Sequence, residues 1–243
     1  MDEYSEETYG ERIAGIYDEW YSEFDPAAIT ALSEIAHGGS VLELGIGTGR
    51  IAIPLHDAGV RLQGIDVSSS MVAKLHAKPG GEKIKVRMGN FADVNIPGKF
   101  SLIYIVFNTF FQLLTQEEQI RCFRNVAGHL LPEGLFVIEA FVPDLTRFTD
   151  GQAMRVNRVG DKQVQIDVSD HEADKQLVVS QHVLLTEQGT QFFPVKIRYA
   201  WPTEMDLMAR LAQLQLRERW GNWSKAPFTA DSGKHISIYE IIK

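Results

Sequence analysis

A hydrophobic strand that runs directly into three alternating glycines constrains this chain more than any other feature. Residues 41–50 read Val-Leu-Glu-Leu-Gly-Ile-Gly-Thr-Gly-Arg, and a segment of helical period follows. Glycine at 45, 47 and 49 allows a tight turn and a close approach of a ligand to the backbone, because no Cβ fills the space. The amino terminus of the following helix favours an anionic group. The segment predicts a ligand-binding turn at the end of a buried strand.

The residue that ends the next strand indicates which ligand this turn holds. Asp66 follows Gly45 by 21 residues, where a carboxylate can accept hydrogen bonds from two vicinal ribose hydroxyls. Arg50 occupies the place where the dinucleotide fingerprint Gly-x-Gly-x-x-Gly has its third glycine. The pattern therefore predicts a nucleoside site and disfavours a dinucleotide such as NAD.

Hydrophobic periodicity around the turn predicts an α/β fold. Short Val/Ile/Leu-rich runs alternate with helical segments from residue 41 to about 141, as in a parallel sheet with crossover helices. Strands are expected at 41–45, 61–66, 84–88, 101–107 and 135–141. Helices are expected to begin after Thr48 and Ser68, and Thr115 with Glu118 forms a capping box for 116–131.

The flanking segments complete a single domain, 1–243. The amino-terminal part, 1–37, is expected to hold a helix over 8–24 with a Thr8/Glu11 capping box, then a helix over 26–37. After residue 150 the period changes to two, which predicts an antiparallel extension over 151–201. The Rossmann-like core comprises 38–150 and 202–243, with a helix at 202–211 and strands at 213–219 and 235–242.

Charge and composition indicate which classes of binding partner and which cellular compartment to expect. Lys and Arg number 24 against 32 Asp and Glu, a net charge of −8, which disfavours a nucleic-acid or anionic-membrane platform. The longest apolar run, 102–107, is far too short to span a membrane, and the amino terminus is acidic. We expect a cytoplasmic protein with a small-molecule partner, and the sequence leaves a homo-oligomer open. The single cysteine, Cys122, is expected to be buried, and no metal site is expected.

These segments resemble the class I S-adenosylmethionine-dependent methyltransferases, whose fold is a Rossmann-like seven-stranded sheet with helices on both faces. The resemblance covers residues 41 to about 141, and it implies S-adenosylmethionine as the cofactor. In that family the glycine turn lies against the aminocarboxypropyl arm, the residue at Glu43 helps to place the arm, and the acid at Asp66 binds the ribose. Met71 resembles the adenine wall, and Asn90 stands where an acid commonly reads the adenine amino group.

The resemblance also implies a role for the segment after the strand at 101–107, which in such enzymes contacts the methionine arm and the acceptor. Together with an amino-terminal helix that closes over the cofactor, it predicts a set of cofactor-binding residues: Tyr9, Tyr17, Glu43, Gly45, Gly47, Gly49, Asp66, Val67, Met71, Asn90, Phe91, Phe107 and Asn108.

The acceptor side is predicted from aromatic residues. Phe110 and Phe111 follow the carboxyl end of a parallel strand, where such folds place ligands, so we expect them to line the acceptor pocket. With Tyr9 and Tyr17 they form the predicted catalytic set. The segment lacks the Asn/Asp-Pro-Pro-Tyr/Phe motif of enzymes that methylate nucleobase or glutamine amides. His171 and His182 fall in the extension, where a solvated or structural role is expected.

In layout the chain is nearest to natural-product N-methyltransferases of the amino-sugar and lincosamide types, which carry a Tyr-containing amino-terminal helix and an antiparallel extension. An amine acceptor needs no strong base once it is deprotonated, whereas an oxygen acceptor does. Because no His/Asp pair is obvious in the sequence, N-methylation by in-line displacement is the preferred interpretation. A small-molecule O-methyltransferase, a non-catalytic S-adenosylmethionine-binding protein and an NAD-dependent oxidoreductase are the alternatives.

Overall fold

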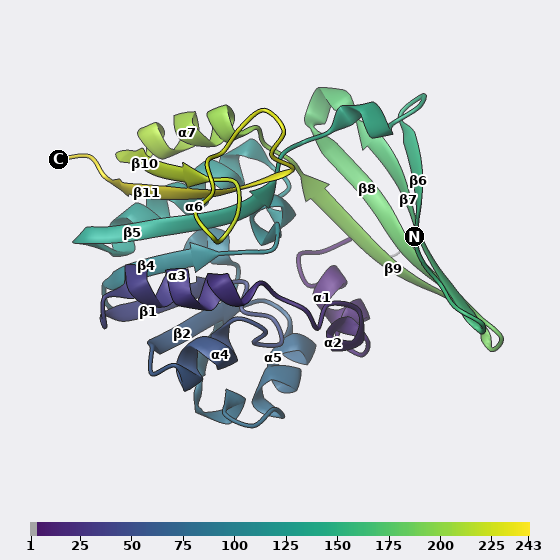
Figure 1. Ribbon diagram of the computed structural model, residues 1–243, viewed down its shortest axis with the longest axis horizontal. Helices are drawn as coiled ribbons and strands as arrows, with labels where there is room; N and C mark the ends of the chain where they lie inside the picture. Colours follow the sequence, from purple (N-terminus) through teal and green to yellow (C-terminus); the bar gives the residue numbers. More distant parts are fainter. Residues whose placement is uncertain (1–3) are drawn as a thin grey trace.

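The computed structural model describes residues 4–243 and contains two sheets (Figure 1). Residues 1–3 of the predicted amino-terminal segment 1–37 lie outside this range. The larger sheet has seven strands in the order β10-β11-β5-β4-β1-β2-β3. Their bounds are β1 Ser40–Leu44, β2 Arg61–Asp66, β3 Lys85–Met88, β4 Phe100–Ile105, β5 Leu130–Phe141, β10 Leu214–Trp220 and β11 Lys234–Ile241.

The strand order creates a ligand site at the carboxyl end of β1. Strands β1 to β5 are parallel, and β1 pairs with β2 on one side and with β4 on the other. The chain therefore leaves β1 in one direction across the sheet and later returns to the other side, and open α/β sheets bind ligands at such a switch point. Strand β11 is antiparallel to β5, and β10 is antiparallel to β11. The predicted Rossmann-like sheet is confirmed.

Helices cover both faces of this sheet, because side chains along each strand point alternately to opposite faces. Val41 and Leu102 pack in a cluster with α3 and α4, whereas Leu42 and Ile103 pack in a cluster with α6 and α7. The helices are α3 Pro26–Ala36, α4 Ala52–Asp57, α5 Ser69–His76, α6 Gln116–His129 and α7 Pro202–Leu211. Short 3₁₀ turns are η1 Gly81–Lys83, η2 Phe91–Asp93, η3 Thr109–Gln112, η4 Leu145–Arg147 and η5 Ala173–Lys175. No helix within residues 4–243 is both long and apolar enough to cross a membrane.

Of the helix caps predicted at Thr48, Ser68 and Thr115, the last two form and the first does not. Ser68 caps α5 by accepting from the Met71 amide, and Thr115 and Glu118 form the full capping box of α6. Thr48 does not cap α4, which begins only at Ala52; its hydroxyl instead donates to Asp18 across 2.6 Å. The prediction at Thr48 was wrong because the three glycines extend the turn and a tertiary contact takes the hydroxyl.

A second, four-stranded antiparallel sheet projects from the body of the molecule (Figure 1). Its strands, in the order β6-β7-β8-β9, are β6 Gln152–Val159, β7 Gln163–Glu172, β8 Leu177–Thr186 and β9 Gly189–Arg198. The period-two pattern identified the regions of β7, β8 and β9. It missed β6, an exposed edge strand in which polar and apolar residues do not alternate regularly and whose pairing with β7 is shifted between Val156 and Arg158.

The amino-terminal segment lies between the two sheets as two short helices, α1 Thr8–Ile13 and α2 Tyr17–Trp20. The predicted continuous helix over 8–24 was wrong, since a turn containing Gly15, a poor helix former, separates them. The predicted capping box is also absent: Glu11 instead accepts hydrogen bonds from the Ser68 and Ser70 hydroxyls at the start of α5. Tertiary contacts thus outweigh the local helical pattern here.

Candidate active site

The glycine turn after β1 leaves open space beside one glycine. A Cβ built on Gly47 would meet nothing within 4 Å, and the φ of Gly47 is +55°. A Cβ on Gly45 would lie 2.4 Å from the Thr109 methyl, and one on Gly49 would lie 3.0 Å from Leu75. The space beside Gly47 is therefore available to a ligand, while Gly45 and Gly49 are required by packing. Gly49 does not line the cavity described next.

Asp66 is bound to this turn. Its Oδ2 accepts from the Gly47 amide at 2.7 Å, and its Oδ1 accepts from the Ser68 amide at 2.8 Å. Burial raises the pKa of the Asp66 carboxyl, although these backbone hydrogen bonds oppose the rise. Each carboxylate oxygen can accept a second hydrogen bond, so the side chain fits the expected ribose contact.

A small cavity of about 60 Å³ gathers many of the predicted cofactor residues around Gly47 and Asp66. The predicted residues that line it are Tyr9, Tyr17, Gly45, Gly47, Asp66, Val67, Met71 and Phe91. Asn90 is adjacent: its Oδ1 accepts from the Ala92 amide, and its Nδ2 donates to Glu6, which lines the cavity. The adenine contact expected of Asn90 stays a prediction.

Glu43 lies beneath the turn, in the interior. Only 3% of this residue is exposed, and its Oε2 accepts from the Tyr104 hydroxyl at 2.7 Å. Burial raises the pKa of the Glu43 carboxyl to about 8, against the lowering effects of the Tyr104 hydrogen bond and of the Arg50 charge. Glu43 lines neither this small cavity nor the second, larger cavity described below. Its expected role toward the methionine arm therefore stays a prediction.

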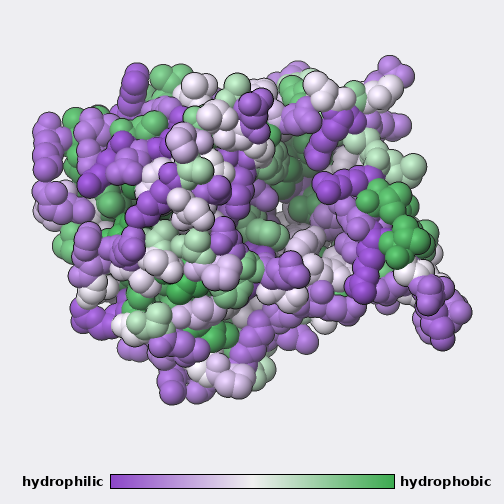
Figure 2. All heavy atoms as spheres, in the orientation of Figure 1, coloured by the Kyte–Doolittle hydropathy of each residue, from purple (hydrophilic) through white to green (hydrophobic). Residues whose placement is uncertain are grey.

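A second cavity, of about 720 Å³, lies between the main body and the inner face of the four-stranded sheet. Figure 2 shows the molecule hollowed between these two parts. Phe107 and Asn108 line this cavity and not the small one, so the cofactor contacts predicted for them stay a prediction. Four residues line both cavities, so the two spaces are neighbours there: Tyr9, Tyr17, Thr109 and Gln112.

Phe110 and Phe111 do not line the acceptor cavity, and that prediction was wrong. Both are fully buried, Phe110 against Phe123 and Phe111 against Phe141. The 3₁₀ turn η3 directs these two rings into the core, while the residues at its ends, Thr109 and Gln112, face the cavities. The signal was present in the sequence, since polar residues flank the two aromatic ones.

The larger cavity contains a histidine–aspartate pair that the sequence analysis missed. His182 and Asp167 both line it, and Nδ1 of His182 lies 2.5 Å from Oδ1 of Asp167. They are 15 residues apart and become neighbours only through the register of β7 with β8. The absence of such a pair was the reason for preferring nitrogen over oxygen acceptors, and that reason no longer holds. His171 instead stacks on Phe148, and its Nε2 lies 3.0 Å from the Tyr199 hydroxyl.

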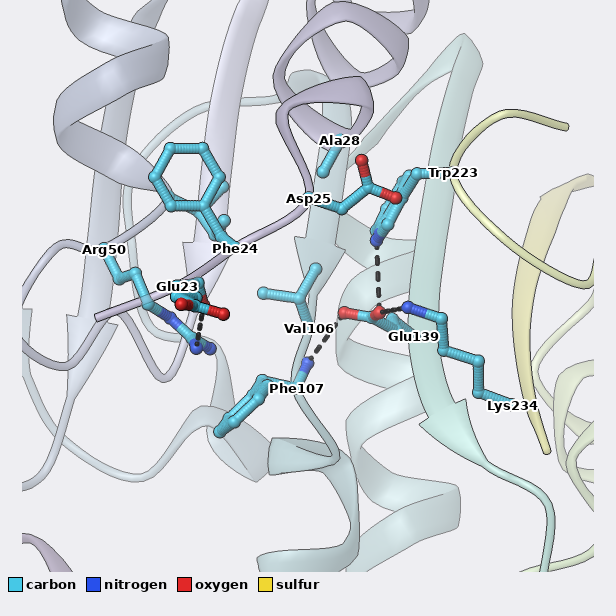
Figure 3. A pocket seen from close by; sticks show the side chains of 11 residues that line it. Glu23, Phe24, Asp25, Ala28, Arg50, Val106, Phe107, Glu139, Trp223 and Lys234 are labelled. Carbon is cyan, nitrogen blue, oxygen red and sulfur yellow. Dashed lines mark hydrogen bonds and ion pairs between the residues drawn. The ribbon is translucent and has the colours of Figure 1, made fainter. Parts of the chain in front are cut away.

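A third cavity, of about 370 Å³, lies on the other side of Phe107 (Figure 3). The Arg50 guanidinium stacks 3.7 Å from the centre of the Phe107 ring, and it donates to the carbonyl oxygens of Tyr21 and Glu23. Glu139 accepts from the Phe107 amide at 3.2 Å and from Lys234 at 2.8 Å. Phe107, whose φ is +58°, is thus fixed as a wall between two cavities.

The side chains at these cavities contain no evident metal centre. No group of three or more His, Cys, Asp or Glu side chains suited to a metal ion occurs within residues 4–243. The expectation that transfer needs no metal stays a prediction.

Comparison with known proteins identifies the family. A profile of the methyltransferase domain matches residues 41–134. The structure of the CcbJ methyltransferase from Streptomyces caelestis matches with a TM-score of 0.92 and 37% identity, over 99% of this chain and 100% of that one. The chain belongs to the S-adenosylmethionine-dependent methyltransferases. The NAD-dependent alternative is thereby set aside, and the predicted cofactor is confirmed as S-adenosylmethionine.

Two curated relatives extend this picture of the methyltransferase. The cypemycin N-terminal methyltransferase from a Streptomyces species is 28% identical over 240 residues, 96% of this chain and 97% of that protein. The dTDP-3-amino-3,6-dideoxy-alpha-D-glucopyranose N,N-dimethyltransferase from Streptomyces fradiae is 24% identical over 139 residues, 54% of each chain. The first name places methyl transfer at an amino terminus, and the second describes methyl transfer to the nitrogen of an amino sugar.

Proposed function

We propose that this methyltransferase transfers a methyl group to the amine nitrogen of a small molecule. The observation that carries the proposal is that the two cavities are neighbours, with Tyr9, Tyr17, Thr109 and Gln112 in the walls of both. The smaller cavity lies on the glycine turn and Asp66, and the larger has the volume of a small-molecule site, for which about 300–1,000 Å³ is typical. A reactant in each cavity would meet the other at these four residues.

The chain's own residues align the reactants and exclude water. Gly47 would lie against the aminocarboxypropyl arm of S-adenosylmethionine and Asp66 would bind its ribose. The cofactor supplies an electrophilic methyl group on a positive sulfonium. Tyr9 and Tyr17 line the junction, and aromatic faces attract a cation. Positioning of this kind supplies much of the acceleration when the reactants carry their own electrophile and nucleophile.

The choice of nitrogen rests on the names of the two curated relatives. One relative is named for methylation at an amino terminus, a position that carries an α-amine, and the other for methylation of an amino-sugar nitrogen. These names support an amine acceptor of the kind found in secondary-metabolite or antibiotic biosynthesis.

The test uses a panel of amines, each compared with an analogue whose nitrogen is blocked by acetylation. The protein is incubated with S-adenosylmethionine and amino sugars, short peptides with a free α-amine, or cyclic secondary amines, each beside its N-acetylated analogue. Mass spectrometry should detect S-adenosylhomocysteine and an acceptor with one more methyl group for at least one free amine and not for its blocked partner. Cofactor binding without methylation of any amine would refute the proposal and favour a non-catalytic binding protein.

O-methylation is the second candidate, and the His182–Asp167 pair is the observation that favours it, because an alcohol or phenol needs a base. Phenols and sugar alcohols without nitrogen belong in the same panel. Methylation confined to these compounds would assign oxygen as the acceptor atom.

A further inference from the structure

Two ionisable side chains face the larger cavity from neighbouring strands of the projecting sheet. Asp167 on β7 pairs in register with His182 on β8, and their side chains are 25% and 15% exposed. Both line the cavity that also contains the junction residues Tyr9 and Tyr17. The rings of Tyr9 and Trp20 lie 6.5 and 6.3 Å from the His182 ring, centre to centre. His182 is thus enclosed by aromatic rings, Asp167 and the cavity.

The hydrogen bond to Asp167 sets the protonation of the imidazole. Hydrogen bonds from His182 and Asn157 lower the pKa of the Asp167 carboxyl, although burial opposes its ionisation. An ionised carboxylate only accepts, so the neutral imidazole carries its proton on Nδ1 and keeps a lone pair on Nε2. Nε2 has no hydrogen-bond partner within the described residues 4–243. A basic nitrogen is therefore left for a molecule in the cavity.

The pair is not needed to join the two strands. Strands β7 and β8 are in register over their whole lengths, from Gln163 opposite Thr186 to Glu172 opposite Leu177. In the next inward-facing row, Ser169 and Ser180 already form a hydrogen bond of 2.7 Å between their hydroxyls. A histidine and an aspartate at this row thus require another explanation than strand pairing.

We propose that His182 is the catalytic residue that takes a proton from the methyl acceptor, with Asp167 as its positioning residue. The proposal rests on the proposed function and makes its substrate class specific: an amine that arrives in the cavity as its ammonium ion. Alkylammonium groups have pKa values near 10, so at pH 7 only about one molecule in 10³ carries the lone pair that transfer requires.

The proton and electron balance of the step is simple. An ammonium N–H bond breaks, its electron pair stays on the nitrogen, and the proton passes to Nε2 of His182. Asp167 stabilises the imidazolium that forms. The free nitrogen lone pair then forms the bond to the methyl carbon as the carbon–sulfur electron pair goes to sulfur, and the imidazolium returns its proton to solvent.

Other ionisable groups around the pair shape its response to pH. Arg155 on β6 is opposite Asp167 in register, and Arg147 in η4 lines the same cavity. The phenols of Tyr9, Tyr17 and Tyr21 also line the cavity, and burial raises the pKa of each above its ordinary value. The tyrosines therefore stay neutral near pH 7, while the arginines oppose additional positive charge beside Asp167.

The kinetic test compares His182→Gln and Asp167→Asn with wild type, using an amine methylated in the panel. The matched control is His171→Gln, which removes a histidine of the same sheet that does not line the cavity. At pH 7 we expect His182→Gln to lower kcat/KM about 100-fold, the usual scale of proton-transfer catalysis, and Asp167→Asn to lower it less. Affinity for S-adenosylhomocysteine by calorimetry and the circular dichroism spectrum should not change in either variant.

The pH profile separates a base from a structural residue. As the pH approaches the pKa of the amine itself, solvent supplies the neutral amine, so the rates of His182→Gln and wild type should converge. A constant rate deficit at all pH values, or turnover of His182→Gln at the wild-type rate at pH 7, would overturn the role of His182 and leave the proposed function intact. Absence of amine methylation by the wild-type protein would overturn both.

A second readout needs no acceptor. Long-range ¹H–¹⁵N correlation spectra of protein labelled with ¹⁵N-histidine report which ring nitrogen carries the proton, and His182→Gln assigns the signal among the seven histidines. We expect the Nδ1–H tautomer for the neutral His182 ring, and loss of that preference in Asp167→Ala. An Nε2–H tautomer in the wild-type protein would overturn the proposal.

Discussion

The Gly47 amide donates a 2.7 Å hydrogen bond to Oδ2 of Asp66, and it thereby joins the turn after β1 to the end of β2. The same carboxylate accepts from the Ser68 amide, the residue that caps α5. Asp66 therefore holds together two segments that line the small cavity, besides presenting its oxygens to a ligand. Two predictions follow from the two sides of this contact.

Asp66→Ala should weaken binding of S-adenosylmethionine by tenfold or more. The change removes a charged acceptor, whose hydrogen bonds are worth about 1.5–3 kcal/mol each, and it leaves the Gly47 and Ser68 amides without their partner. Isothermal titration calorimetry with S-adenosylhomocysteine measures the effect. Asp66→Asn keeps one acceptor oxygen and should have a smaller effect; an unchanged affinity of Asp66→Ala would exclude Asp66 from the site.

Gly47→Val should abolish cofactor binding without unfolding the protein. The new side chain would project into the open space beside the turn, and the φ of +55° strains a β-branched residue. Gly128→Ala in α6 is the control, because Gly128 also has nothing within 4 Å of its Cβ position but lies in an ordinary helix far from the cavities. Wild-type affinity in Gly47→Val would mean that the turn is structural only.

Glu43 should make the protein less stable as the pH rises. Burial raises its pKa to about 8 from an ordinary 4.5, so between these values the folded state binds more protons than the unfolded state. Its contribution to stability is complete below about pH 4.5 and is lost as the pH rises through about 8. Glu43→Gln, which keeps the volume and an acceptor for Tyr104, should flatten the fall in Tm between pH 6 and 9. The exposed Glu82→Gln is the control, and equal slopes in all three proteins would contradict this assignment.

The sequence predicted those residues of the site whose positions follow from a local strand–turn–helix pattern. Gly47, Asp66 and Met71 come close together because parallel strands end at one edge of the sheet, so a strand–turn–helix pattern is enough to place them. The buried orientation of the Phe110 and Phe111 rings depends on a single 3₁₀ turn, whose polar ends, Thr109 and Gln112, were its only sequence signal.

The His182–Asp167 pair shows a different limit. It depends on the register of two antiparallel strands, and a shift of one residue would place the two side chains on opposite faces of the sheet. The positions of α1 and α2 are likewise set by partners distant in sequence, since Ile13 packs with Met71 and Phe193 from α5 and β9. The sequence of residues 8–24 by itself does not indicate those packing partners.

The amino-terminal helices should act as a lid over the cofactor. The cavity at Gly47 is about 60 Å³, well below the roughly 300 Å³ of small ligand sites, and Tyr9 and Tyr17 lie in its wall, so entry of the cofactor requires these helices to move. We expect a chain that begins at Asp25 to keep the seven-stranded sheet, whose core clusters contain neither α1 nor α2, but to lose nearly all methyl transfer. Tyr9→Ala or Tyr17→Ala alone should lower kcat about tenfold or more, which corresponds to about 1.4 kcal/mol. Circular dichroism and turnover of the shortened chain test this role. Normal turnover would refute the lid. An unfolded shortened chain would assign α1 and α2 to the core.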